Sequence, residues 1–143
     1  MDPETYDIKI VSYSTVHDAG RILNPMIVEG QIYGAAVHGI AGALYEEFRY
    51  NEDGQLVTSS FMDYLCPTAT EAPRLSMDHI ETPSPFTLLG AKGVGEGNTM
   101  SAPPALANAI ADAMRPLGLR ISELPITPNT LFEAVHKSTE VAE

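Results

Sequence analysis

The sequence of 143 residues contains a single cysteine, Cys66, and few basic side chains. One cysteine excludes an internal disulfide framework, a cysteine-based zinc site and an iron–sulfur cluster held by this chain alone. We expect Cys66 to be a small buried apolar residue rather than a nucleophile. The 8 lysine and arginine residues are outnumbered by 19 acidic ones, so the net charge is -11. This charge argues against non-specific binding to nucleic acid or to an anionic membrane, because both surfaces repel negative charge.

The sequence also lacks a long hydrophobic run. The longest weakly polar stretch, residues 26–44, is interrupted by a carboxylate, an amide and an imidazole, which makes a membrane span a poor interpretation. No signal peptide is recognisable, because Met1 is followed at once by acidic residues. We therefore expect no membrane contact and a cytoplasmic location. With 44% hydrophobic residues the chain can form one core, and we interpret residues 1–143 as a single unit.

The hydrophobic periodicity predicts an α+β fold with mixed or antiparallel strands, a long glycine-rich helix and a second helix after a glycine-rich loop. We expect strands near 8–15, 75–81 and 120–122, a hairpin over 48–61, and helices over 25–47, 101–114 and 127–136. The first helix begins at Asn24-Pro25, since asparagine caps free amides and proline at the first helical position loses no hydrogen bond. Each of its interior glycines costs about 1 kcal/mol relative to alanine. Close approach of another backbone or of a ligand would offset that cost.

The segment 90–97, Gly-Ala-Lys-Gly-Val-Gly-Glu-Gly, is the most informative part of the sequence. It places the carboxylate of Glu96 in a backbone flanked by glycines, just before a predicted helix, where a bulky ligand can approach the main chain. The dinucleotide fingerprint fails because residue 98 is asparagine, and the Walker motif fails because Lys92 is followed by glycine. The alternative is a surface turn whose glutamate lies near a helix dipole.

The first helix carries a second group of candidate residues on one face. Gln31 and His38, with small residues at 35 and 42, follow the i, i+4, i+7, i+11 spacing of a shared face. The alternative is a tightly packed core helix with two satisfied polar side chains. The other three histidines lie far apart and show no metal-ligand spacing, so we predict no metal ligand in this chain.

Together these motifs resemble the molybdenum hydroxylases, in the C-terminal part of their large, molybdopterin-binding subunit. This is the family of xanthine dehydrogenase, aldehyde oxidase and the carbon monoxide dehydrogenase large subunit. The resemblance covers nearly the whole chain in the expected order. It rests on the segments Asp18–Pro25, Val28–Gln31, Gly34, His38–Gly39, Tyr45–Glu47, Gly90–Glu96, Ser101–Met114 and Leu124–Pro128.

The resemblance implies a role for each matching residue. Glu96 falls on the family's general base, which takes a proton from a molybdenum-bound hydroxyl before an electron-poor carbon of an aldehyde, purine or N-heterocycle is hydroxylated. A departure occurs at residue 38, which is histidine where the family pattern usually has glutamine. The positions that match segments close to the cofactor are Gly30, Gln31, Gly34, His38, Gly93, Val94 and Gly95.

The family's subunit is several times longer than this chain, so the resemblance implies half a site. Molybdenum–molybdopterin would be shared with the remainder of the subunit, and iron–sulfur clusters and FAD would lie only on partner chains of the electron-transfer type. The alternative is a non-catalytic structural or interaction module that keeps the fold without the cofactor.

Overall fold

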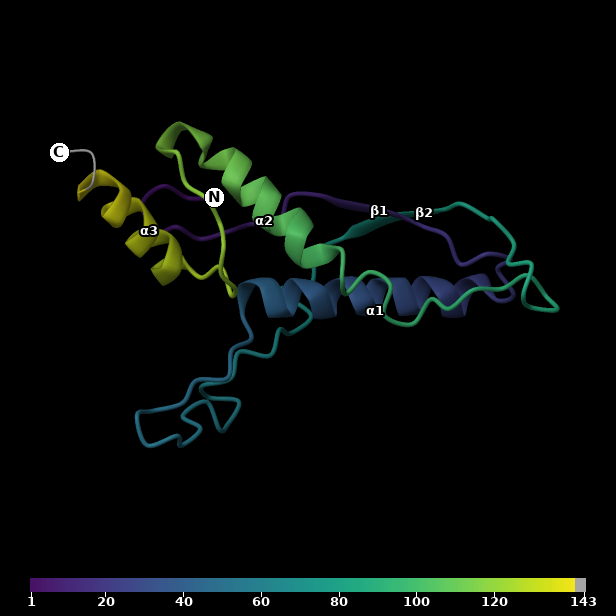
Figure 1. Ribbon diagram of the computed structural model, residues 1–143, viewed down its shortest axis with the longest axis horizontal. Helices are drawn as coiled ribbons and strands as arrows, with labels where there is room; N and C mark the ends of the chain where they lie inside the picture. Colours follow the sequence, from purple (N-terminus) through teal and green to yellow (C-terminus); the bar gives the residue numbers. More distant parts are fainter. Residues whose placement is uncertain (141–143) are drawn as a thin grey trace.

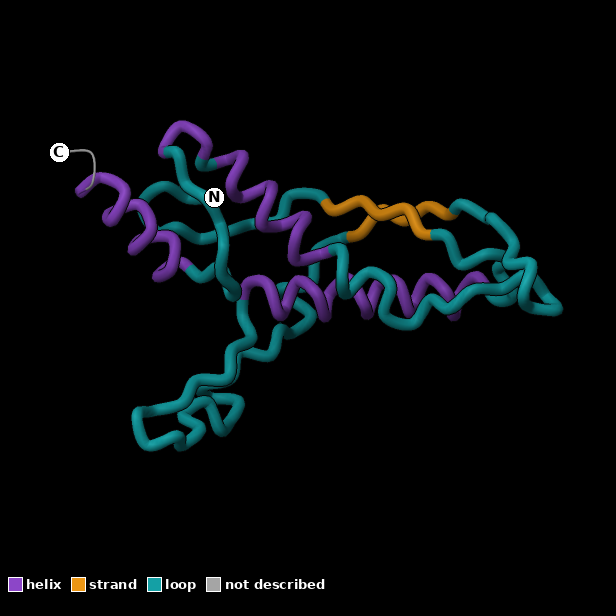
Figure 2. The backbone as a smooth tube through the Cα atoms, in the orientation of Figure 1, coloured by secondary structure: helices purple, strands orange, loops and turns teal. Residues whose placement is uncertain are grey.

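The computed structural model describes residues 1–140 of the chain. The two strands lie side by side next to one half of the long helix α1, and α2 packs against the other half (Figure 1). The segment that joins α1 to β2 projects from this body as an irregular loop (Figure 2). The elements in chain order are β1 (Tyr13–His17), α1 (Pro25–Leu44), β2 (Leu75–His79), α2 (Ala102–Ala113), a short 3-10 helix (Arg115–Leu117) and α3 (Pro128–Glu140).

Helix α1 begins where the sequence predicts. The side chain of Asn24 accepts a hydrogen bond from the amide of Ile27, and Pro25 occupies the first turn. The helix ends at Leu44 rather than near residue 47, because Tyr45 leaves the helical conformation at φ -131°. The expected start is confirmed and the expected end is a few residues too late.

The two strands pair in parallel, from Tyr13 opposite Leu75 to His17 opposite His79. Antiparallel pairing occurs in isolated bridges, between residues 20 and 91 and between residues 50 and 56. The α+β class with mixed pairing is therefore confirmed. β1 begins at Tyr13 and not at residue 8, because the backbone of residues 8–12 pairs with no other segment among the described residues.

One local expectation holds in part and two are wrong. The hairpin over 48–61 forms around its expected turn, with an antiparallel bridge between residues 50 and 56 and a bond from the Val57 amide to the Arg49 carbonyl at 2.8 Å, but it is shorter than expected and forms no regular strands. Residues 120–122 form no strand, because Ile121 packs against the core instead of pairing with a neighbour. Cys66 is exposed, because it lies in the projecting loop.

The core lies where α1, α2 and the C-terminal segment meet. Its buried side chains include Ile40 of α1, Ile110 of α2 and Leu131 of α3. Gly39 allows the two long helices to approach, since a Cβ there would lie 2.7 Å from the Thr99 carbonyl oxygen. The close backbone approach expected from a glycine-rich helix thus occurs at Gly39.

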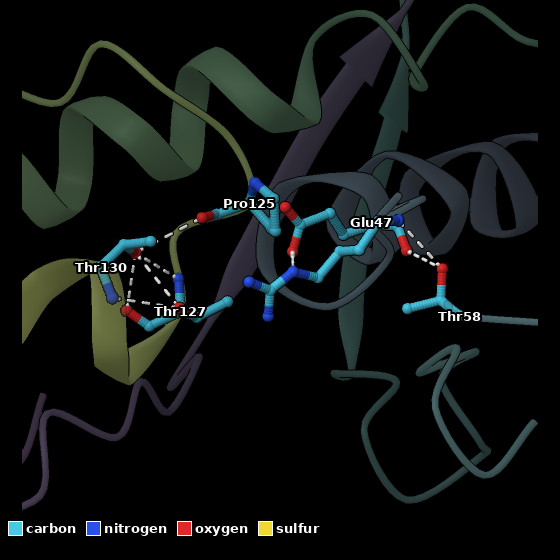
Figure 3. Close-up of polar contacts among 6 residues, drawn as sticks. Glu47, Thr58, Pro125, Thr127 and Thr130 are labelled. Atoms are coloured by element: carbon cyan, nitrogen blue, oxygen red, sulfur yellow. Dashed lines mark hydrogen bonds and ion pairs between the residues drawn. The ribbon is translucent and has the colours of Figure 1, made fainter. Parts of the chain in front are cut away.

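Threonine side chains form hydrogen bonds with backbone groups at the start of α3 and in the projecting loop (Figure 3). At the start of α3, the Thr127 amide donates to Oγ1 of Thr130 at 2.8 Å, and the Thr130 amide donates to Oγ1 of Thr127 at 3.1 Å. In the projecting loop, the Thr58 hydroxyl donates to the carbonyl of Glu47 at 3.1 Å. These reciprocal and local bonds satisfy backbone groups that the secondary structure leaves free.

Candidate functional site

The glycine-rich segment is attached at its beginning to the turn that follows β1. The Arg21 amide donates to the carbonyl of Gly90 at 3.0 Å, and the Lys92 amide donates to the carbonyl of Ala19 at 2.8 Å. Gly20 has a positive φ of 62°, and a Cβ on it would collide with the carbonyl of Gly90. The two segments therefore approach as closely as their backbones allow.

A polar cluster of Asp18, Thr82 and Lys92 holds this attachment. The Lys92 ammonium donates to the Asp18 carboxylate at 2.8 Å and to the Thr82 hydroxyl at 2.6 Å, and the Thr82 hydroxyl also donates to Asp18. The Gly20 amide donates to the same carboxylate at 2.8 Å. These donors, Lys92 first and Thr82 next, hold the pKa of Asp18 well below its ordinary value. Sequence reasoning missed this cluster, because its members come from three separate segments.

The far end of the glycine-rich segment is a turn, residues 95–100, that leads directly into α2. Asn98 is the buried anchor of this turn, with 3% of its surface exposed. Its side chain accepts from the Thr15 hydroxyl of β1 at 3.1 Å and donates to the Ile32 carbonyl of α1 at 3.5 Å. The Thr99 hydroxyl donates to the carbonyl of Ala35 at 3.1 Å.

Asn98 and Thr99 are therefore the residues that hold Glu96 beside α1, and sequence reasoning missed both. The only available signal was their place between the predicted base and the predicted second helix. The Thr99 amide donates to the carbonyl of Glu96 at 3.0 Å. The backbone of the glutamate is thereby fixed while its side chain stays exposed.

The structure brings six of the eight predicted site residues together around one open cleft of about 190 Å³. One wall is the face of α1 predicted from helical spacing, and the other is the turn that carries Glu96. The predicted residues that line the cleft are Gly30, Gln31, Gly34, His38, Gly95 and Glu96, with Ala35 and Thr99 completing the lining.

The other two predicted residues lie outside this lining. Val94 packs against the small apolar cluster of Ala19, Val28 and Ile32. Gly93 lies in an exposed part of the loop, where a Cβ would meet no atom within 4 Å. Val94 therefore fastens the glycine-rich segment to α1, and its side chain serves packing.

The cleft leaves space for a polar group of a ligand beside α1. A Cβ at Gly30 or at Gly34 would meet no atom within 4 Å, so nothing in the described part of the chain uses the space that these glycines leave. Gln31 offers both a hydrogen-bond donor and an acceptor, His38 offers ring nitrogens, and Glu96 offers a carboxylate. This donor and acceptor set suits the polar edge of a cofactor, while the glycines let its bulk approach the helix.

The described residues contain neither a membrane-spanning helix nor a cluster of metal-binding side chains. Within residues 1–140 no helix is long and apolar enough to cross a membrane. In the same range, no group of three or more histidine, cysteine, aspartate or glutamate side chains is placed to hold a metal ion.

Comparison with known proteins gives consistent matches. The chain is 49% identical over 133 residues to the 6-hydroxypseudooxynicotine dehydrogenase complex subunit gamma of Paenarthrobacter nicotinovorans, covering 92% of this chain and 17% of that protein. It is 41% identical to the carbon monoxide dehydrogenase large chain of Afipia carboxidovorans, covering 79% of this chain and 14% of that one. The chain thus spans less than a fifth of the length of these relatives.

Solved structures give the same result. Quinoline 2-oxidoreductase from Pseudomonas putida 86 superposes with a TM-score of 0.93 and 42% identity, covering 96% of this chain and 17% of that one. A Cu,Mo-CO dehydrogenase superposes with a TM-score of 0.89 and 36% identity, covering 94% of this chain and 17% of that one. Residues 1–73 match the family model for the molybdopterin cofactor-binding domain. The chain therefore belongs to the molybdopterin cofactor-binding domain family of the molybdenum hydroxylases.

Proposed function

We propose that this chain is part of the catalytic subunit of a molybdenum hydroxylase and that Glu96 is its general base. The observation that carries the proposal is the cleft, which Glu96 lines together with Gln31 and His38 of α1. When bound, molybdenum–molybdopterin supplies the two-electron redox chemistry for hydroxylation at an electron-poor carbon of an aldehyde, purine or N-heterocycle.

The chain's own part in that reaction is proton transfer and positioning. An exposed carboxylate that lines a cleft and whose backbone is fixed can accept a proton without a reorganisation of the loop. Such a positioned base contributes typically about 10²–10⁴-fold to a rate. Gln31 and His38 would hydrogen-bond the cofactor, and Gly30 and Gly34 would let it lie against the helix. The glycine at residue 95 leaves the main chain open beside the base.

The proposed assembly contains the remainder of the molybdopterin-binding subunit and separate electron-transfer subunits that carry iron–sulfur clusters and FAD. The relatives support this arrangement, since one is described as subunit gamma of a dehydrogenase complex and others as large subunits or large chains. One cysteine in this chain cannot hold an iron–sulfur cluster, which is consistent with clusters on other chains.

The test is Glu96→Gln in the assembled enzyme. This substitution keeps the shape of the side chain and removes the base, so we expect turnover to fall by about 10²-fold or more while the molybdenum content per subunit is unchanged. Glu29→Gln is the matched control, because Glu29 is exposed on α1 and lies outside the cleft lining. Near-normal turnover of Glu96→Gln would refute the role of the base. An assembly without molybdenum would instead favour a non-catalytic module.

A further inference from the structure

A second cavity is also lined by residues of the turn that carries Glu96. It is a groove of about 690 Å³ between the extended residues 8–17 and one face of α2. The α2 face contributes buried Leu106 and Ile110 together with the exposed small residues Ala105 and Ala109. Gly97 and Asn98, the two residues after Glu96, line the end of this groove.

The wall of the groove opposite α2 has backbone groups without partners. Among the described residues, no amide or carbonyl of residues 8–12 forms a hydrogen bond. The segment is nevertheless patterned as a strand, since Ile8 and Ile10 pack against the core while Val11 is 92% exposed. Five consecutive unpaired residues in an extended backbone are a ready template for an added strand.

The free edge continues into β1. The Ile80 amide donates to the carbonyl of His17 at 3.0 Å, so the backbone of His17 faces β2. Because backbone groups alternate in direction along a strand, those of Ser14 and Val16 face away from β2. A two-stranded sheet is marginally stable without a third strand or a covering helix. The unpaired edge and the apolar groove therefore fit the same kind of partner, an extended segment with apolar side chains.

We infer that the groove is the seat of a β-strand contributed by the rest of the molybdopterin-binding subunit. This inference rests on the proposed function, because it takes that subunit as the partner. The relatives show that more than four fifths of the subunit's length lies outside the segment this chain matches. The added strand runs along residues 8–16, with its backbone bonded to theirs and its apolar side chains against α2.

Docking of this strand also acts on the site. Asn98 links the two cavities, since its side chain is bonded to Thr15 of β1 and its backbone continues the turn of Glu96. A strand paired with β1 fixes Thr15 and closes the groove behind Gly97. Glu96 then faces the cleft on a turn that is supported from both sides.

The test combines hydrogen exchange with a matched pair of variants on α2. Ala109 and Asn108 are neighbouring exposed residues, and only Ala109 lines the groove. We expect Ala109→Phe to weaken assembly with the separately expressed remainder of the subunit by at least 10-fold in Kd, and Asn108→Phe to leave it unchanged. Circular dichroism spectra and melting curves of both variants that match those of the wild type would show that folding is intact.

In the wild-type assembly we expect the amides of residues 9–16 to exchange at least 10-fold more slowly than in this chain alone. Assembly unaffected by Ala109→Phe, or unprotected amides, would overturn the inference. Protection of the same amides in a self-associated form of this chain, abolished by Ala109→Phe, would overturn it in favour of a second copy. Glu96→Gln should assemble normally, so failure of the proposed chemistry and failure of the docking surface give different results.

Discussion

Gly39 gives the sharpest test of how the two long helices are held together. In an alanine variant the new Cβ would lie 2.7 Å from the Thr99 carbonyl oxygen, 2.8 Å from the Ala102 Cβ and 3.2 Å from the Pro103 Cδ. Two of these atoms belong to the backbone or to the first carbon of a side chain, so they cannot rotate away. α1 and α2 must separate for the methyl group to fit.

The size of the effect follows from a comparison with Gly42 in the same helix. A Cβ at Gly42 meets no atom within 4 Å, so Gly42→Ala should gain the helix preference of alanine and stabilise the chain by about 0.5–1 kcal/mol. Gly39→Ala has the same gain and the additional cost of overpacking, about 1–3 kcal/mol. The difference between the two variants isolates that cost.

The assay is urea unfolding of the two variants and the wild type, followed by circular dichroism. We expect unfolding midpoints in the order Gly42→Ala, wild type, Gly39→Ala, with similar slopes for all three. If the Gly39→Ala variant unfolds at the same urea concentration as Gly42→Ala, the close approach of the helices is refuted. The same displacement would move the turn that carries Glu96, so turnover in the assembled enzyme should fall with Gly39→Ala and not with Gly42→Ala.

Three further predictions follow from the site. Asn98→Ala removes two long-range hydrogen bonds and leaves their partners unsatisfied, so urea unfolding should show a loss of about 1–3 kcal/mol; an unchanged midpoint would contradict its anchoring role. The Lys92 ammonium lowers the pKa of Asp18, so the stability that this carboxylate contributes is present above its ordinary pKa of 3.8 and is lost as the pH falls below that value. Asp18→Asn should therefore show a weaker acid dependence of its urea midpoint than the wild type, and identical profiles would be the contrary result. Gly34→Val should leave the fold intact, since nothing lies near its Cβ, but should lower molybdenum content in the assembled enzyme; full occupancy would exclude cofactor contact at this position.

Local signals account for the parts of the fold that were predicted well. The start of α1 follows from Asn24-Pro25, because a cap and a fixed φ act within one turn. The start of α2 follows from Pro103 and Pro104, which are tolerated only in a first turn. The meeting of Gln31, His38 and Glu96 in one cleft combines helical spacing, which gave the face, with a family resemblance, which linked that face to the loop.

The parts that were missed depend on contacts distant in the sequence. Parallel pairing of β1 with β2 joins segments separated by all of α1 and the projecting loop, and no local pattern specifies it. The hydrogen bonds of Asn98 to Thr15 and to Ile32 are equally long-range. An asparagine before a helix is normally interpreted as a cap or a turn residue, so its burial becomes visible only when β1, α1 and the turn are placed together.

The turn that carries Glu96 depends on contacts within this chain and also borders the groove. The effects of these two kinds of contact on turnover can be measured separately. Asn98 and Thr99 hold the turn from within the chain, so their loss should lower the stability of the chain alone. Ala109 also lines the groove from α2 but is exposed, so its substitution should affect only the assembled enzyme. A variant that lowers turnover without changing the urea midpoint of the isolated chain must therefore act through the cleft or through the groove. Assembly distinguishes these two, because a substitution in the groove weakens binding of the remainder of the subunit, whereas a substitution in the cleft such as Glu96→Gln leaves that binding unchanged.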